Sequence, residues 1–155
     1  MKRVITTLNE MSFDLPKGWA LSEDIYSLPN GQGMINKENY ISDKGEVISL
    51  FEVKRDPDDF FIYYDNLVNN YIQITQKYSL AKKCNLKVGE FILPTYIIKG
   101  FEGDKQFYCM QVFVNCGDCL ACFMLNLPKI ESSMKKTIEN NHVVGELVKI
   151  LRTVE

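Results

Sequence analysis

The sequence predicts an α+β fold in which helices pack against an antiparallel sheet. Short segments of strand character fill the first third of the chain, and turn residues such as Pro16 and Gly18 separate them. A long segment with helical spacing follows, then further strands, and a second helical region closes the chain. This order of strands, helix, strands and helix is typical of an antiparallel sheet with packed helices.

The elements before the central helix are short. Strands are expected at 4–8, 12–15 and 19–28, and a hairpin is expected from 34–41 and 46–54, with its turn at 42–45.

The central helix is predicted from Asp56, a good N-cap, and Pro57 at the first helical position. It continues to about Tyr78, because apolar side chains recur at helical spacing there.

Later strands are expected at 84–93, 96–102, 106–115 and 119–127, with turns at Gly103-Asp104 and Gly117-Asp118. The closing helical region has two apolar faces, which Asn140-Asn141 interrupts. The first face carries Ile130, Met134 and Ile138, and the second carries Val144, Leu147, Val148 and Leu151.

The predicted hairpin at 107–127 lacks the alternation of a half-exposed strand. One expected face carries Phe107, Cys109, Phe113, Phe123 and Leu125, and the other carries Tyr108, Met110, Val112, Val114, Leu120 and Met124. Two interpretations remain open. Helices cover both faces, or one face is an apolar groove for a partner.

Composition narrows the class of protein. With 155 residues, 46% of them hydrophobic and 25% charged, the chain suits one domain spanning 1–155. A net charge of −2 without a basic cluster argues against a nucleic-acid partner.

No apolar run approaches the roughly 20 residues of a membrane span. We expect a cytoplasmic protein whose five cysteines, an odd number, are reduced thiols.

Candidate chemistry is sparse. Cys116, Cys119 and Cys122 have overlapping C-x-x-C spacings, but a hairpin turn would send Cys119 and Cys122 to opposite faces of a strand.

The lone His142 has no nucleophile motif beside it and is expected to be solvated or to cap a helix. We therefore expect no catalytic residues, no metal and no cofactor. Gln111 is a polar residue in an apolar strand, and it either bonds nearby groups or faces a groove.

The segment FDLPKGW at 13–19 is similar to the F-x-(I/L)-P-x-x-W opening of the DcrB-like proteins. Matching pieces follow in the same order over nearly the whole chain, namely IYSLP at 25–29, DP at 56–57 and MQVF at 110–113. The resemblance implies the PsbP/DcrB-like α/β/α sandwich.

Within that family, the chain resembles the cytosolic Eag chaperones of type VI secretion. The resemblance implies a homodimer that shields apolar segments of a secreted effector, with Ile25, Met34 and Gln111 in the partner-binding groove. Glu23 departs from the family, which prefers an apolar residue there. The alternatives are a module for a small apolar ligand or lipid, an immunity-like or scaffold protein, and a cysteine-dependent metal or redox protein.

Overall fold

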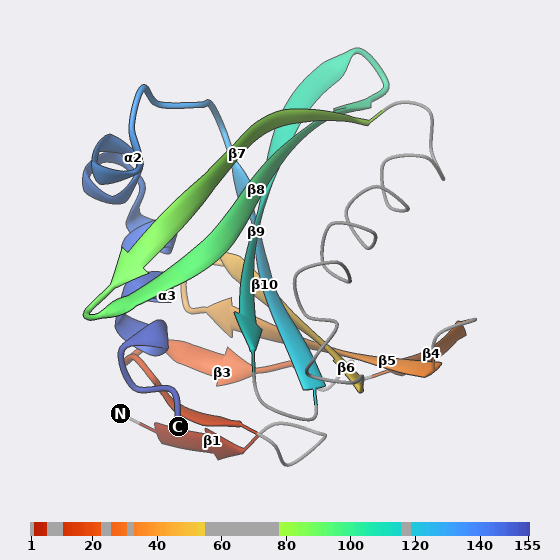
Figure 1. The fold of residues 1–155 in the computed structure, drawn as a ribbon, viewed down its shortest axis with the longest axis vertical. Helices are drawn as coiled ribbons and strands as arrows, with labels where there is room; N and C mark the ends of the chain where they lie inside the picture. The colour runs from red at the N-terminus through yellow and green to blue at the C-terminus, as the bar shows by residue number, and fades with distance from the viewer. Residues whose placement is uncertain (1, 6–10, 23–25, 31–32, 55–77, 116–118) are drawn as a thin grey trace.

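The computed structural model describes residues 2–5, 11–22, 26–30, 33–54, 78–115 and 119–155. These residues form a two-stranded sheet, an eight-stranded antiparallel sheet and two helices (Figure 1), which confirms the α+β class. The small sheet pairs β1 (Lys2–Ile5) with β2 (Ser12–Leu15). The large sheet contains β3 (Trp19–Leu21), β4 (Tyr26–Asn30), β5 (Gly33–Ser42), β6 (Val47–Lys54), β7 (Ser79–Val88), β8 (Phe91–Glu102), β9 (Lys105–Asn115) and β10 (Cys119–Leu127).

The strands of the large sheet follow the order β3, β5, β6, β10, β9, β8 and β7. β4 also pairs with β5, so that β3 and β4 share one edge of that strand. The predicted hairpin of β5 and β6 is confirmed. The Ser42 hydroxyl oxygen accepts hydrogen bonds from the backbone N–H groups of Lys44 and Glu46, at 3.2 and 3.1 Å.

The strand predicted at 84–93 is wrong, because it joins the end of one strand to the start of the next. β7 ends at Val88 and β8 begins at Phe91, with Gly89 between them at a φ of 60°. A positive φ suits a tight hairpin turn and favours glycine. Pro94 lies inside β8, where the pairing with β9 has not yet begun, so its missing N–H removes no bond to that strand.

The closing helical region consists of α2 (Met134–Asn140) and α3 (His142–Leu151), and the predicted interruption is confirmed. Asn141 lies between the two helices. Its side-chain oxygen accepts a hydrogen bond from the Val144 backbone N–H at 3.1 Å, which caps α3. Its own backbone N–H donates to the Thr137 carbonyl at the end of α2.

Two predicted elements fall outside the described residues. The central helix expected from Asp56 lies in 55–77, and the turn at Gly117-Asp118 lies in 116–118. The α/β/α layering implied by the resemblance depends on the first of these. The strand predicted at 119–127 is confirmed as β10.

Both faces of the β9–β10 hairpin are apolar and buried, but the faces differ from those predicted. Phe123 lies opposite Val112, and Met124 lies opposite Gln111. Opposite residues in an antiparallel pair share a face. Odd-numbered residues of β9 therefore share a face with even-numbered residues of β10, so the predicted faces, which group odd with odd, are wrong.

The face that contains Val112 and Phe123, here called the first face, belongs to the larger hydrophobic core, which also contains residues of α3 and β2. Leu147 of α3 and Phe13 of β2 are fully buried there, and Phe13 packs edge-on against Phe123 with ring centroids 5.7 Å apart. The second face has its own cluster, which consists of Tyr96, Ile98, Phe113, Leu120 and Cys122. In the described part of the chain, no helix combines the length and apolar character that crossing a membrane requires.

Candidate functional site

The three groove residues implied by the resemblance have different positions. Ile25 lies outside the described residues. Met34 is in β5, opposite Pro29 of β4, and Gln111 is in the middle of β9. β6 and β10 lie between β5 and β9, which separates Met34 and Gln111 by about 14 Å across the sheet. The sheet does not bring these two residues together.

Gln111 is buried, with 4% of its surface exposed. Its amide nitrogen lies 3.9 Å from the sulfur of Met124, directly across the strand pair. It also hydrogen-bonds the Cys109 thiol, and this bond lowers the Cys109 pKa against the larger effect of burial. The partners of Gln111 are therefore sulfur atoms on its own face of the sheet.

The described thiols have the character of structural cysteines. Burial raises the pKa of Cys109 to about 12, and it raises the pKa of Cys122 well above its usual range. Burial also raises the pKa of Cys84, while the charge of Lys82 opposes that shift. A reactive thiol needs a lowered pKa. Within the described residues, no three His, Cys, Asp or Glu side chains gather as a metal site would require.

His142 is half-exposed at the start of α3. Its Nε2 lies 3.5 Å from a Glu146 carboxylate oxygen and 3.8 Å from a Glu46 carboxylate oxygen. Glu46 belongs to the turn between β5 and β6, so this contact joins the helix layer to the sheet. The expected surface position of His142 is confirmed.

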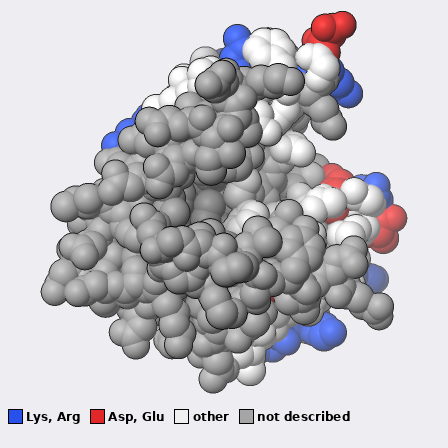
Figure 2. Space-filling view, turned by 90° about the vertical axis from the view of Figure 1, so that its right-hand side faces the viewer, with Lys and Arg blue, Asp and Glu red and all other residues white. Residues whose placement is uncertain are grey.

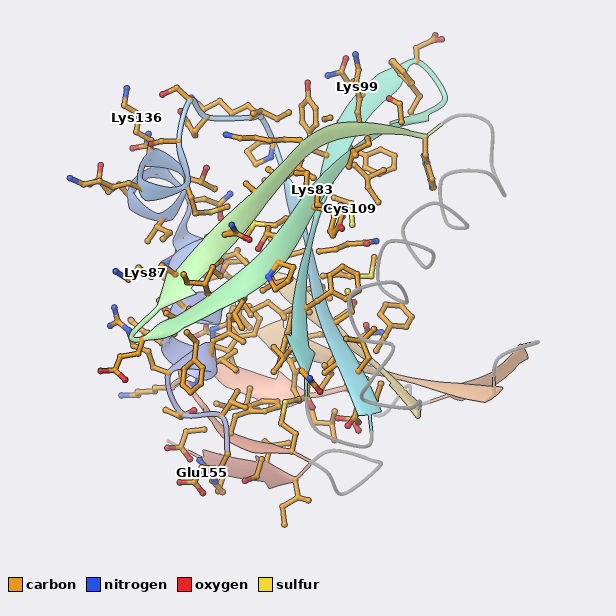
Figure 3. All side chains as sticks on the ribbon, viewed as in Figure 1. Lys83, Lys87, Lys99, Cys109, Lys136 and Glu155 are labelled. Carbon is orange, nitrogen blue, oxygen red and sulfur yellow. The ribbon has the colours of Figure 1, made fainter. Side chains whose placement is uncertain are left out.

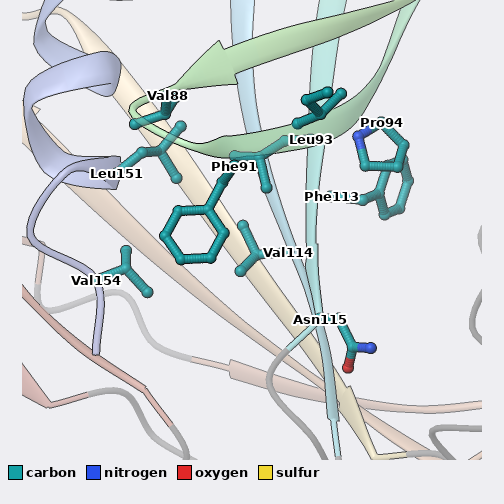
Figure 4. A pocket seen from close by; sticks show the side chains of 10 residues that line it. Val88, Phe91, Leu93, Pro94, Phe113, Val114, Asn115, Leu151 and Val154 are labelled. Carbon is teal, nitrogen blue, oxygen red and sulfur yellow. The ribbon is translucent and has the colours of Figure 1, made fainter.

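A cleft of about 410 Å³ lies beneath the tip of the β7–β8 hairpin (Figure 4). Its walls come from the hairpin tip, the end of β9, the end of α3 and the C-terminal tail. They consist of Val88, Phe91, Ile92, Leu93, Pro94, Phe113, Val114, Asn115, Leu151 and Val154. Among the described residues of these walls, Asn115 supplies the only polar side chain, so the cleft suits an apolar group.

Strand pairing explains why the cleft exists. β8 pairs with β9 only from Thr95 onwards, where Thr95 lies opposite Val112. The first residues of β8 pair with β7 alone, starting with Phe91 opposite Val88. The hairpin tip therefore diverges from β9, and Figure 4 shows the Phe91 ring in the resulting space, between Val114 and Val154.

The C-terminal wall of the cleft is held by β2. The Ser12 backbone bonds Glu155 in both directions, at 3.1 and 2.9 Å, and the Asp14 N–H donates to the Thr153 hydroxyl at 2.8 Å. Arg3 adds an ion pair of 2.8 Å with Glu155. These bonds flank Val154 and fix its position beside Phe91.

The hairpin tip exposes large apolar side chains. Phe91 is 72% exposed and Ile92 is 65% exposed. Scattered apolar residues are normal on a protein surface, but adjoining ones above an apolar cleft are typical of contact sites. The sequence signal was present as Gly89-Glu90 followed by the apolar run at 91–94. The predicted strand at 84–93 runs through this turn, so it does not predict an exposed hairpin tip.

Comparison with known proteins identifies the fold. No family model and no curated protein matches the sequence. A protein from Bacteroides thetaiotaomicron VPI-5482 matches 99% of the chain with a TM-score of 0.56 and 13% identity. Cyanobacterial PsbP (CyanoP) from Synechocystis sp. PCC 6803 also matches 99%, with a TM-score of 0.54 and 14% identity. The chain spans 47% of the Bacteroides protein and 91% of CyanoP.

A looser similarity, with a TM-score of 0.40 and 12% identity, relates 81% of the chain to 46% of the immunity protein TplEi of the type VI secretion system of Pseudomonas aeruginosa. The chain has a PsbP-like fold, as the sequence motifs implied.

Proposed function

We propose that this protein is a non-catalytic binding protein that shields an apolar segment of a partner protein, and that the cleft beneath the β7–β8 tip holds this segment. The observation that carries the proposal is the 72% exposure of Phe91 above a cleft with apolar walls. The described lining contains no titratable or nucleophilic side chain. These residues can therefore bury an apolar group, and they offer no side chain that would form or break a bond.

Burying Phe91 against a partner would contribute a substantial free energy of binding. A phenylalanine side chain covers roughly 200 Å², and burying the 72% of Phe91 that is exposed would contribute roughly 3.6 kcal/mol at about 25 cal/mol per Å². A single anchor of that size is comparable to a hot spot of a protein interface. Ile92 also lines the cleft, is 65% exposed and adds a second apolar contact.

The groove implied by the resemblance is the competing location for the same function. Ile25, Met34 and Gln111 would line it. Because Gln111 is buried, a partner could reach it only after the second face of β9 is uncovered. The cleft requires no such opening.

The test uses a fluorescent, amphipathic leucine-rich helical peptide as the probe, with affinity measured by anisotropy. We expect Phe91→Glu to weaken binding about tenfold or more, because the lost anchor is worth at least 1.4 kcal/mol. Val47→Glu is the matched control, since Val47 is 44% exposed in another hairpin. Gln111→Ala and Met34→Asp test the competing groove. If these two abolish binding and Phe91→Glu does not, the groove is the site.

A second candidate function is the binding of a small apolar ligand or lipid. The volume of about 410 Å³ favours it, because ligand pockets typically measure about 300–1,000 Å³. Native mass spectrometry of the purified protein separates the two functions. A co-purified apolar molecule that Phe91→Glu removes would indicate the ligand-binding module. If neither peptide nor ligand binds, the cleft serves neither purpose.

A further inference from the structure

The two edges of the large sheet are constructed differently. At one end, β5 is covered by β3, which has 3 residues, and by β4, which has 5 residues and contains Pro29. Short strands and proline are devices that protect an edge from further pairing. At the other end lies β7, with 10 residues and no proline. Among the described strands, only β8 pairs with β7.

An edge strand turns the backbone groups of alternate residues away from its partner. The outer edge of β7 therefore presents a row of N–H and C=O groups along one of the longer strands of the sheet. Extended segments of other proteins bind such edges through main-chain hydrogen bonds, while side chains decide which segment is accepted.

The side chains of β7 carry charge of one sign. Lys82, Lys83 and Lys87 lie in the strand, and its sequence SLAKKCNLKV contains no acidic residue. Lys83 and Lys87 are exposed and lie along the length of the strand in Figure 3. Lys82 is on the opposite face, so positive charge flanks the edge on both sides.

This edge charge is local. On the face turned to the viewer in Figure 2, the described acidic and basic side chains lie at the rim and the two signs occur close together. β7 thus differs from the chain as a whole, whose net charge is −2.

Charge decides between the possible occupants of this edge. Lysines on an edge discourage pairing with a second copy, because two identical β7 strands would bring like charges together. The same lysines attract a strand that carries carboxylates.

We propose that the outer edge of β7 accepts an extended acidic segment of a partner protein by strand addition. The main chains pair, and glutamate or aspartate side chains of the segment contact Lys82, Lys83 and Lys87. This interaction uses the edge of the sheet and is independent of the apolar cleft, so it goes beyond the proposed function.

The probe is a capped, labelled peptide of about ten residues in which threonine and glutamate alternate, matched to the length of β7. We expect it to bind with an affinity that falls as salt rises. Hydrogen–deuterium exchange should show protection at alternate amides of β7, because only outward N–H groups gain partners. A peptide with lysine in place of glutamate should not bind.

The triple variant Lys82→Gln, Lys83→Gln and Lys87→Gln should weaken binding of the acidic peptide about tenfold or more, with an unchanged unfolding midpoint. Phe91→Ala adds no charge beside Lys87 and should leave this binding unchanged, which separates the edge from the cleft. Absence of β7 protection in the wild-type protein would overturn the proposal even if the triple variant fails to fold. An oligonucleotide that binds equally well without amide protection would also overturn it, since that result indicates simple charge attraction.

Discussion

The centre of the sheet and the β7–β8 hairpin at its end contain similar side chains in opposite surroundings. Phe123 and Met110 of the central strands have no exposed surface, whereas Phe91 and Ile92 of the hairpin are 72% and 65% exposed. The central strands β9 and β10 have a buried apolar cluster on each face. The tip of the β7–β8 hairpin diverges from β9, so its apolar side chains stay exposed. Apolar residues therefore stabilise the chain in one region and are available for contact in the other.

The largest expected effect contrasts one phenylalanine from each region. Phe123→Ala should lower the free energy of unfolding by about 3–5 kcal/mol, because it leaves a cavity among buried residues and removes the edge contact with Phe13. Phe91→Ala should change it by about 0.5 kcal/mol or less, as for other exposed positions. Urea unfolding of the two variants and the wild type measures both values.

The contrast breaks if the two variants lose similar stability. A loss of about 2 kcal/mol or more in Phe91→Ala would mean that the hairpin tip belongs to the core and that its exposure carries no meaning for binding.

The second expected effect concerns the face of the central strands that contains Cys109. Burial raises the Cys109 pKa to about 12 from its usual 9.0, so the thiol keeps its proton in the folded state while the unfolded chain loses it. Stability is therefore fully present below about pH 9 and falls as pH rises towards 12, by up to about 1.4 kcal/mol per pH unit. Cys122 acts in the same direction. Cys109→Ala should make the decline shallower.

Urea unfolding at pH 8.5, 9.5 and 10.5 provides the measurement, and the comparison uses slopes because Cys109→Ala also changes packing. The phenol of Tyr40 contributes to the decline in both proteins, since burial and its hydrogen bond to Glu38 raise its pKa. Parallel curves for wild type and variant would show that this face is wetter than the structure indicates.

Much of the central region could be predicted from the sequence. Alternation, turn residues and the missing alternation at 107–127 identified most of the strands there and indicated that both faces of the hairpin avoid water. Asn140-Asn141 marked the helix boundary because asparagine is a favoured N-cap. These features depend on local sequence, which explains the success.

The face assignment and the hairpin end were predicted less well than the strands. Grouping Phe123 with odd-numbered residues of β9 followed the parity of the residue numbers, although a two-residue turn at Gly117-Asp118 implies that odd-numbered residues of one strand lie opposite even-numbered residues of the other, as they do. The cleft also escaped prediction. It forms where β8 leaves β9 and the C-terminal tail returns beside Phe91, and this arrangement joins segments far apart in the sequence.

The third expected effect concerns the helix layer over the central strands. Asn141→Ala removes the oxygen that caps α3 and should lower the free energy of unfolding by about 1 kcal/mol. Asn141→Ser keeps an acceptor and should cost less. The neighbouring Asn140→Ala is the matched control, because Asn140 is exposed at the end of α2. Equal losses at Asn140 and Asn141 would show that helix propensity, not the cap, determines this boundary.

The smallest expected effect concerns His142, which contacts Glu46 and Glu146 where the helix layer meets the β5–β6 turn. Its distances of 3.5 and 3.8 Å and its half-exposed side chain indicate a weak, solvent-screened contact. His142→Gln should therefore change stability by less than about 1 kcal/mol, and 1 M salt should reduce the difference further. Thermal unfolding at low and high salt measures this. A larger, salt-independent loss would show that the enclosed region depends on a polar attachment at its rim as well as on its apolar interior, and the contrast with the hairpin would then rest on more than burial.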